Sequence, residues 1–108
     1  MLPRAQRLTG PKDIRDVFRT GAKRGNGLVV CYARKSDRPR AAVVVSNAVG
    51  NAPTRNRVKR RLRHALAMTL PQQSVDLVVR ALPASAHASW NELASATIDS
   101  MTRAVADA

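Results

Sequence analysis

The residues best suited to a chemical role lie in one short segment. Six of the nine residues at positions 55–63 are Lys or Arg, and the segment reads Arg55-Asn56-Arg57-Val58-Lys59-Arg60-Arg61-Leu62-Arg63. A guanidinium group presents its N–H donors in a planar fork that matches the oxygens of a phosphate group. The segment contains no acidic residue that would neutralise these cations. We therefore expect it to bind a polyanion through its phosphate groups.

The spacing of the apolar residues predicts that this segment belongs to an amphipathic helix. At 100° per residue, the side chains expected to dock on the rest of the protein fall within one arc of about 100°. They are Val58, Leu62, Ala65, Leu66 and Thr69, and Leu70 lies at the margin of the arc. The cationic side of the helix carries Arg57, Lys59, Arg60, Arg63 and His64. Like charges one helical turn apart repel each other, and bound phosphate would relieve that repulsion. A helix face that is merely solvated usually mixes both signs of charge, so we favour nucleic acid as the partner.

Positive charge is distributed unevenly along the chain. The formal net charge is +12, from 19 Lys and Arg against 7 Asp and Glu. Residues 1–63 carry 17 basic and 3 acidic side chains, a net charge of +14, whereas residues 64–108 carry 2 and 4, a net charge of −2. Only four of the basic residues are Lys and 15 are Arg. Such a one-sided excess predicts a positive face for nucleic acid.

Other residue types predict structural rather than chemical roles. Cys31 is the single cysteine and lies in an apolar run, so we expect a buried thiol and a reducing compartment. His64 and His87 have no Cys, Asp or Glu at ligand spacing, so we expect no metal bound by the protein itself. Trp90 lies on an apolar helical stripe and is expected in the core. With no membrane-length apolar stretch and no signal-like segment, we expect a soluble, cytoplasmic protein.

The N-terminal part of the chain predicts an arm, a helix and a turn. Residues 1–9 are basic and irregular, which predicts a mobile arm. Pro11 opens a helix that Gly21 stops, and the apolar face of this helix carries Ile14, Val17 and Phe18. Residues 22–26 predict a turn or a very short strand.

The next part of the chain predicts two strands. Leu28–Ala33 and Ala41–Ser46 are rich in β-branched and apolar residues, and good turn residues occupy Ser36–Pro39 between them. Because the connection is short, we expect these two strands to pair as an antiparallel hairpin.

The rest of the chain predicts a long helix, a buried strand and a second long helix. Asn51 is a candidate helix cap, Pro53 fits the first helical turn, and the helix should end near Leu70, before Pro71. The continuous apolar run Val75–Leu82 predicts a well-buried strand. The final helix should pack through Trp90, Leu93, Ala94, Ile98, Met101 and Val105.

This order of elements predicts a single-domain α+β sandwich spanning residues 1–108. It would contain one mainly antiparallel sheet with helices packed against it. The long basic helix stands between two predicted strands and is long enough to be a crossover that joins parallel strands.

The basic segment also resembles a known family signature. The string from Gly50 to Arg63 is similar to the signature of the protein subunit of bacterial ribonuclease P, with its Gly-Asn-Ala lead-in, Arg-Asn-Arg core and following Lys-Arg. Further matches in type and order are Arg7-Leu8, Asp13 to Phe18, Gly21 and Asp76 to Arg80. Two departures are Asn47 and Ala48, where the family commonly has lysines, and Pro53, where it usually has an aliphatic residue.

The resemblance implies an accessory role in an RNA enzyme. It implies that ribonuclease P RNA holds Mg²⁺ and hydrolyses precursor tRNA to give the mature 5′ end, and that this chain supplies no catalytic residue. The family motif implies that the catalytic RNA is contacted by Arg55, Asn56, Arg57, Lys59, Arg60, Arg61 and Arg63. The resemblance also implies a left-handed crossover at the basic helix, against the general right-handed rule.

A second RNA surface is implied by the same resemblance. A cleft between the first helix and the sheet would hold the single-stranded 5′ leader of precursor tRNA, and by position its residues are Ile14, Phe18 and Tyr32. Aromatic rings stack on unpaired bases without sequence preference, which suits a variable leader. Ile14 stands where the family often has an aromatic residue.

Several alternatives share the size and charge of this chain. A ribosomal or other structural RNA-binding protein without a nuclease role is the main one. A helix-turn-helix DNA-binding protein would need a helix directly before the basic one, where strand and loop are predicted. A protein-only nuclease would need clustered acidic residues for metal ions, which the sequence does not offer. We expect no membrane and no protein partner.

Overall fold

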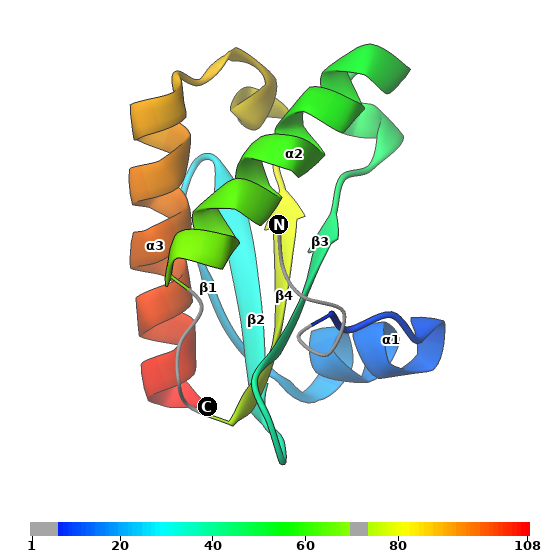
Figure 1. Ribbon diagram of the computed structural model, residues 1–108, viewed down its shortest axis with the longest axis vertical. Helices are drawn as coiled ribbons and strands as arrows, with labels where there is room; N and C mark the ends of the chain where they lie inside the picture. Colours follow the sequence, from blue (N-terminus) through cyan, green and yellow to red (C-terminus); the bar gives the residue numbers. More distant parts are fainter. Residues whose placement is uncertain (1–6, 70–73) are drawn as a thin grey trace.

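The computed structural model describes residues 7–69 and 74–108 of the chain. The elements follow one another as α1 (Pro11–Thr20), β1 (Ala22–Gly25), β2 (Val29–Lys35), β3 (Arg40–Val44), α2 (Ala52–Thr69), β4 (Val75–Ala81) and α3 (Trp90–Asp107). Short 3-10 turns, η2 (Asn47–Val49) and η3 (Pro83–His87), precede α2 and α3. The predicted α+β class and the order of the elements are confirmed, and residues 22–26 do contain a short strand (Figure 1).

The sheet corrects the predicted hairpin. Its strand order is β1-β2-β4-β3, so β4 lies between β2 and β3 and the two do not pair. β4 pairs antiparallel with β2 and parallel with β3. β4 has seven residues, and the first five of them, Val75–Val79, are all buried. A strand that is apolar on both sides is most stable at the centre of a sheet with both faces covered, and a β2–β3 hairpin would have displaced it to an edge.

The connection from β3 through α2 to β4 is a left-handed crossover. In Figure 1 both strands run upward, α2 crosses in front of them, and the chain moves to the left from β3 to β4. The predicted crossover between parallel strands is therefore confirmed, and its hand is the rare one.

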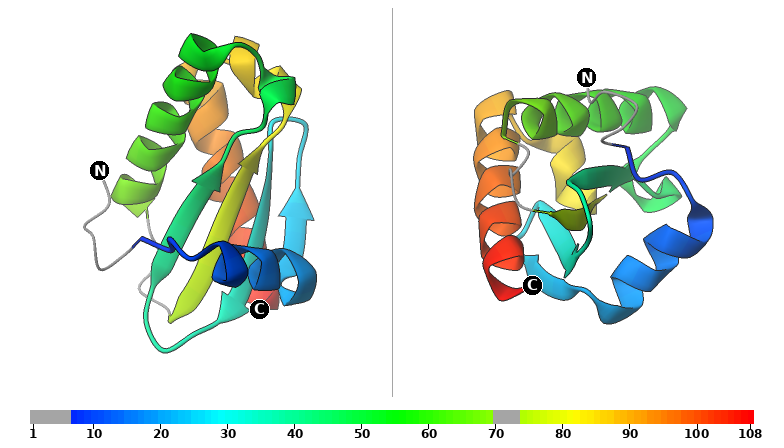
Figure 2. Two further views of the ribbon diagram at one scale, coloured as in Figure 1. Left: turned by 90° about the vertical axis from the view of Figure 1, so that its right-hand side faces the viewer. Right: turned by 60° about the horizontal axis from the view of Figure 1, so that its bottom comes forward.

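The helices cover the two faces of the sheet unequally. Helices α2 and α3 lie on one face and α1 lies on the other (Figure 2). The larger core lies beneath α2 and α3 and includes Leu62, Leu66, Leu77 and Leu93. A smaller cluster lies beneath α1. Among the described residues, α1 and the segment that leads into it cover this second face, and Val30, Ala42 and Val44 on it are only partly buried.

Residues 7–9, the last part of the predicted mobile arm, pack against the sheet instead. Leu8 is 3% exposed, and its N–H donates to the carbonyl oxygen of Ala41 at 2.8 Å. Arg7 forms a parallel bridge with Ala41 at the outer edge of β3. Residues 7–9 are therefore held against the sheet because Leu8 fills the small core. The prediction of an arm relied on the basic composition of residues 1–9 and overlooked this apolar side chain. Residues 1–6 lie outside the described part of the chain.

Local capping residues set the starts of both long helices. Asn51 accepts a hydrogen bond from the Thr54 N–H at 3.0 Å, as its predicted capping role requires. At α3, Ser89 and Glu92 form a reciprocal capping box. The predicted end of α2 near Leu70 and Pro71 falls at residues outside the described part. No helix within the described ranges is long and apolar enough to cross a membrane.

The buried face of α3 differs in part from its prediction. Leu93 and Met101 are buried as expected. Small or polar side chains at Thr97, Ser100 and Ala104 are buried as well, and Thr97 and Ser100 use their hydroxyl groups to donate to backbone carbonyls. An apolar pattern alone could not identify these positions.

Candidate nucleic-acid interface

The basic helix α2 docks on the sheet by the predicted stripe. Val58, Leu62, Ala65 and Leu66 are buried, each at 1% exposure or less. Burying a Val or Leu side chain contributes roughly 1.5–3 kcal/mol, so this stripe holds the helix firmly and fixes which residues face outward. Thr69 belongs to the helix, but its side chain lies outside the described part.

Three arginines of the helix are held by backbone carbonyls. Arg55 Nη1 donates to the carbonyl oxygen of Gly50 at 3.1 Å, within the loop that precedes the helix. Arg57 Nη2 donates to Ala86 at 2.9 Å, and Arg61 Nη1 donates to Ala88 at 3.2 Å. These two bonds tie α2 to η3 and to the segment that enters α3. Residue types and helical spacing alone do not indicate which cations of one helix bind backbone carbonyls and which do not.

The remaining polar residues of the motif are uncommitted. Within the described ranges, no hydrogen bond or ion pair engages the side chains of Asn56, Lys59, Arg60 or Arg63. No acidic residue occurs between Asp37 and Asp76 in the sequence. This side of α2 therefore offers three cations and an amide for an anionic partner without competition from an internal carboxylate.

The second candidate surface is the sheet face beneath α1. Phe18 and Tyr32 form an edge-to-face pair with ring centroids 4.7 Å apart. Both residues belong to the small cluster that also includes Ile14, so the structure brings together the three residues expected in the leader cleft. Tyr32 is only 6% exposed and Phe18 is half-buried, so Phe18 is the more available ring.

A hollow of about 400 Å³ opens beside these rings, lined by Phe18, Lys23, Tyr32, Val44 and Arg80. Arg80 is exposed although it lies on the central strand, and Lys23 stands beside Tyr32 in the register of β1 and β2. The Lys23 Nζ lies 5.9 Å from the Tyr32 ring centroid. The sequence analysis did not identify Lys23 or Arg80. The one signal available was that Arg80 is a charged residue within the largely apolar run of β4, which could have indicated an exposed position.

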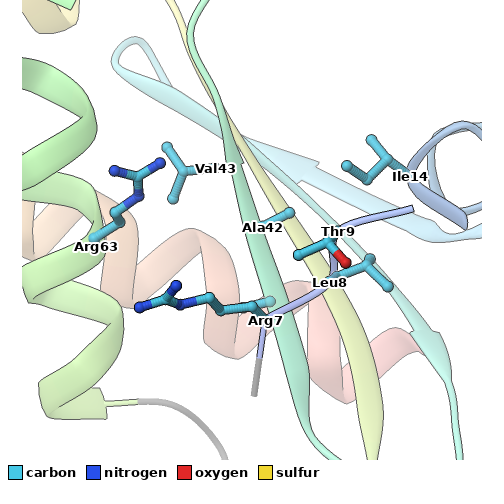
Figure 3. A pocket seen from close by; sticks show the side chains of 8 residues that line it. Arg7, Leu8, Thr9, Ile14, Ala42, Val43 and Arg63 are labelled. Carbon is cyan, nitrogen blue, oxygen red and sulfur yellow. The ribbon is translucent and has the colours of Figure 1, made fainter. Parts of the chain in front are cut away.

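A second hollow, of about 310 Å³, lies at the β3 edge between the two surfaces. Figure 3 shows Arg7 and Arg63 extending toward the same region from the N-terminal segment and from α2. Ile14 lines this hollow rather than the one beside Phe18. The cationic side of α2 and the face beneath α1 are therefore connected along β3.

Comparison with known proteins decides the family. A family model described as Ribonuclease P matches residues 2–105. The ribonuclease P protein component of Micrococcus luteus is 44% identical over 121 residues, covering 97% of this chain and 92% of that protein. That of Kocuria rhizophila is 47% identical over 98 residues and covers 87% of each. This chain belongs to the ribonuclease P protein family.

Solved structures share the fold of this family member. The RNase P protein of Staphylococcus aureus, in a mutant with defective mRNA degradation activity, superposes with a TM-score of 0.87 at 23% identity, covering 94% of this chain and 90% of that one. The RNase P protein of Thermotoga maritima, in complex with 1-(4-fluorophenyl)-2-thiourea, gives 0.82 at 23% identity, covering 90% and 98%. At this identity the likeness establishes the α+β architecture alone.

One cluster of charged side chains lies at the end of the sheet face beneath α1. The Asp76 carboxylate is 1% exposed and accepts hydrogen bonds from Arg34 at 3.2 Å and Arg40 at 2.9 Å. The hydrogen bond to Asp76 raises the pKa of Arg40 above its ordinary value. Both arginines are thus occupied by an internal carboxylate, which distinguishes them from the uncommitted cations of α2.

The single thiol has no accessible chemistry. Burial raises the pKa of Cys31 to about 11, and a hydrogen bond with Ser100 lowers it in part. The thiolate is therefore scarce at neutral pH, as the apolar run predicted. Within the described residues, no group of three or more His, Cys, Asp or Glu side chains is placed to hold a metal ion.

Proposed function

We propose that this protein is the RNA-binding subunit of ribonuclease P in the 5′ maturation of tRNA. Its cationic helix α2 binds the catalytic RNA, through residues drawn from Arg55, Asn56, Arg57, Lys59, Arg60, Arg61 and Arg63. The observation that carries this proposal is a helix docked by a fully buried stripe whose outward cations have no acidic neighbour in the sequence from residue 38 to residue 75. Phosphate is the anion that such a surface suits best.

In this proposal the chemistry belongs to the RNA. Hydrolysis of a phosphodiester by a protein site with two metal ions needs clustered carboxylates that hold the two ions about 4 Å apart. The described residues do not fit Mg²⁺ in this way, because Asp76 is held between two arginines and Asp16 pairs with Arg19. Mg²⁺ is therefore assigned to the RNA partner, and no catalytic residue is assigned to this chain.

The sheet face beneath α1 is the proposed site for the precursor's single-stranded 5′ leader. A leader base would stack on the accessible ring of Phe18, which Tyr32 supports edge-on. Lys23 and Arg80 line the same hollow and are suited to the leader phosphates. Ile14 would contribute apolar contact at the neighbouring hollow on the β3 edge.

The proposal is tested by reconstitution with the cognate ribonuclease P RNA. We expect the protein to increase 5′ processing of precursor tRNA at low Mg²⁺ and to favour binding of precursor over mature tRNA. Cleavage by the protein without RNA, or copurification with ribosomal subunits instead of one RNA, would overturn it. The latter result would restore the alternative of a structural RNA-binding protein.

The leader site is tested by Phe18→Leu, which keeps an apolar side chain but removes the stacking ring. We expect precursor binding to weaken by roughly 1–3 kcal/mol, the usual contribution of one base–aromatic stack. Binding of mature tRNA, which lacks the leader, should hardly change. Ile98→Val on α3, which lies over the opposite face of the sheet, is the control and should leave both affinities unaltered. Equal losses on both substrates for Phe18→Leu would exclude the leader assignment.

A further inference from the structure

An aromatic pair lies where α2 meets α3, on a different side of α2 from the β3 edge. The rings of His64 and Trp90 have centroids 5.5 Å apart and cross at 69°. His64 is exposed and Trp90 is partly exposed, so the pair is not sealed within the core where Trp90 was expected. Met68, one helical turn beyond His64, is 58% exposed and is the exposed large hydrophobic residue found in the described ranges.

Two arginines of the basic motif hold this pair in place. Arg61 donates to the carbonyl oxygen of Ala88, two residues before Trp90, and Arg57 donates to Ala86. The Ser89–Glu92 capping box then fixes the first turn of α3, where Trp90 stands. The ring of Trp90 is therefore positioned from both helices before any partner binds, which reduces the entropy lost on binding.

The surroundings of the pair suit a nucleotide. Arg60 lies one turn before His64 on the outward side of α2 and is exposed and uncommitted. The carboxylate of Glu92, the acidic residue in the first turn of α3, is engaged by the N–H of Ser89 at 2.9 Å. A cation beside exposed aromatic rings is the combination that binds an unpaired nucleotide, with its phosphate on the cation and its base on a ring.

We propose that His64 and Trp90 form a stacking platform for an unpaired base of the RNA that α2 binds. The proposal rests on the proposed function of α2 and adds base contact to phosphate contact. It also gives Arg57 and Arg61 a positioning role, through η3 and the start of α3, in addition to any contact that their remaining N–H groups make with phosphate.

Trp90 is the single tryptophan, so its fluorescence reports on this site alone. The holoenzyme is titrated from its parts, the full chain and the cognate ribonuclease P RNA, while Trp90 emission and its quenching by acrylamide are followed. We expect RNA to quench the emission and to protect the ring from acrylamide. Unchanged emission and unchanged acrylamide access at saturating RNA would overturn the platform.

Variants at His64 separate the ring from its charge. We expect His64→Ala to weaken RNA binding roughly tenfold, as loss of one base stack does, with unfolding unaffected because the position is exposed on a helix. His64→Phe should restore affinity and His64→Lys should not. His87→Ala, at an exposed histidine of η3, is the control and should bind as the wild type does.

The outcomes distinguish this inference from the function it rests on. RNA binding that is tight and salt-dependent, but equal for His64→Ala, His87→Ala and the wild type, overturns the platform and leaves the proposed function intact. Rescue by His64→Lys rather than by His64→Phe also overturns it, since charge would then be the property that matters. No measurable binding of the cognate RNA by the wild type would overturn both.

Discussion

The arginines of α2 are alike in sequence but differ in what they contact. The Arg61 side chain donates a hydrogen bond to the carbonyl oxygen of Ala88, whereas no hydrogen bond or ion pair in the described ranges engages the Arg60 side chain. A hydrogen bond of this kind contributes roughly 0.5–1.5 kcal/mol to stability, and more when the donor is charged. An uncommitted surface cation contributes little to stability and can release a counterion from RNA instead. Neighbouring residues of one motif thus have separable roles.

Comparison of Arg60→Ala with Arg61→Ala tests this division. We expect Arg60→Ala to lower the slope of log affinity against log salt by about one unit, since about one phosphate contact is lost. Its free energy of unfolding should stay within about 0.5 kcal/mol of the wild type. Arg61→Ala should instead lower the free energy of unfolding by about 1–2 kcal/mol. Urea unfolding and RNA titrations at several salt concentrations measure both quantities, and an identical profile for the two variants would refute the division.

At the scale of the elements, local signals were reliable and strand pairing was not. The buried stripe of α2, the cap at Asn51 and the apolar run of β4 depend on neighbours in sequence, so periodicity and residue type predicted them. The β2–β3 hairpin was wrong because pairing is decided by competition among strands, and β4 enters from more than thirty residues away. The hand of the crossover came from the family resemblance and could not have come from the pattern.

The candidate site shows the same limit. The residue types that bind phosphate were identifiable in the basic segment, and Phe18 and Tyr32 were placed together by resemblance. Lys23 and Arg80 required the register of the sheet, because they reach the hollow only through β1 and β4. The hydrogen bonds of Arg57 and Arg61 required η3, whose path over α2 has no sequence signature.

Gly21 shows how one residue sets the position of an element. Its φ of −75° is open to any residue, so it is not needed for a left-handed turn. A Cβ at this position would lie 2.6 Å from the carbonyl oxygen of Val17 and 3.0 Å from that of Ala33. Both neighbours are backbone atoms, so α1 and β2 could accommodate a side chain only by moving apart. The glycine therefore permits the close approach that places Phe18 beside Tyr32.

We predict that Gly21→Ala destabilises the protein by roughly 1–3 kcal/mol, the usual cost of overpacking. It should also reduce the preference for precursor over mature tRNA, because α1 carries Phe18. Gly27→Ala is the matched control, since a Cβ there meets nothing within 4 Å, and its stability should change little. Thermal unfolding and paired tRNA titrations provide the measurements. A fully stable Gly21→Ala variant with normal discrimination would show that α1 is not held by this contact.

At the scale of the whole molecule, charge acts on folding and on binding in opposite directions. A formal net charge of +12 on 108 residues destabilises the compact state through self-repulsion. The ion pairs in the described ranges relieve only part of this repulsion, because none of them involves a residue of α2. Salt screens exposed like charges over about 10 Å at 0.1 M, so it should stabilise the free protein. The same ions compete with the protein for the RNA phosphates and should weaken the complex.

We therefore predict salt effects of opposite sign on one molecule. Raising NaCl from about 50 to 500 mM should increase the free energy of unfolding of the protein alone, while its affinity for ribonuclease P RNA falls steeply. The double variant Arg60→Gln, Arg63→Gln removes two uncommitted cations from α2, so both responses should become shallower together, the binding slope by about two units. The control is Arg38→Gln, which removes one charge from the exposed turn between β2 and β3, away from α2. Arg34→Gln is unsuitable as a control because Arg34 binds the buried Asp76 carboxylate. Urea unfolding and filter-binding titrations across the same salt series measure the two responses. A free energy of unfolding that falls with salt would mean that attraction within ion pairs outweighs repulsion between like charges in the free protein. The uncommitted cations of α2 would then cause no net repulsion for bound RNA to relieve.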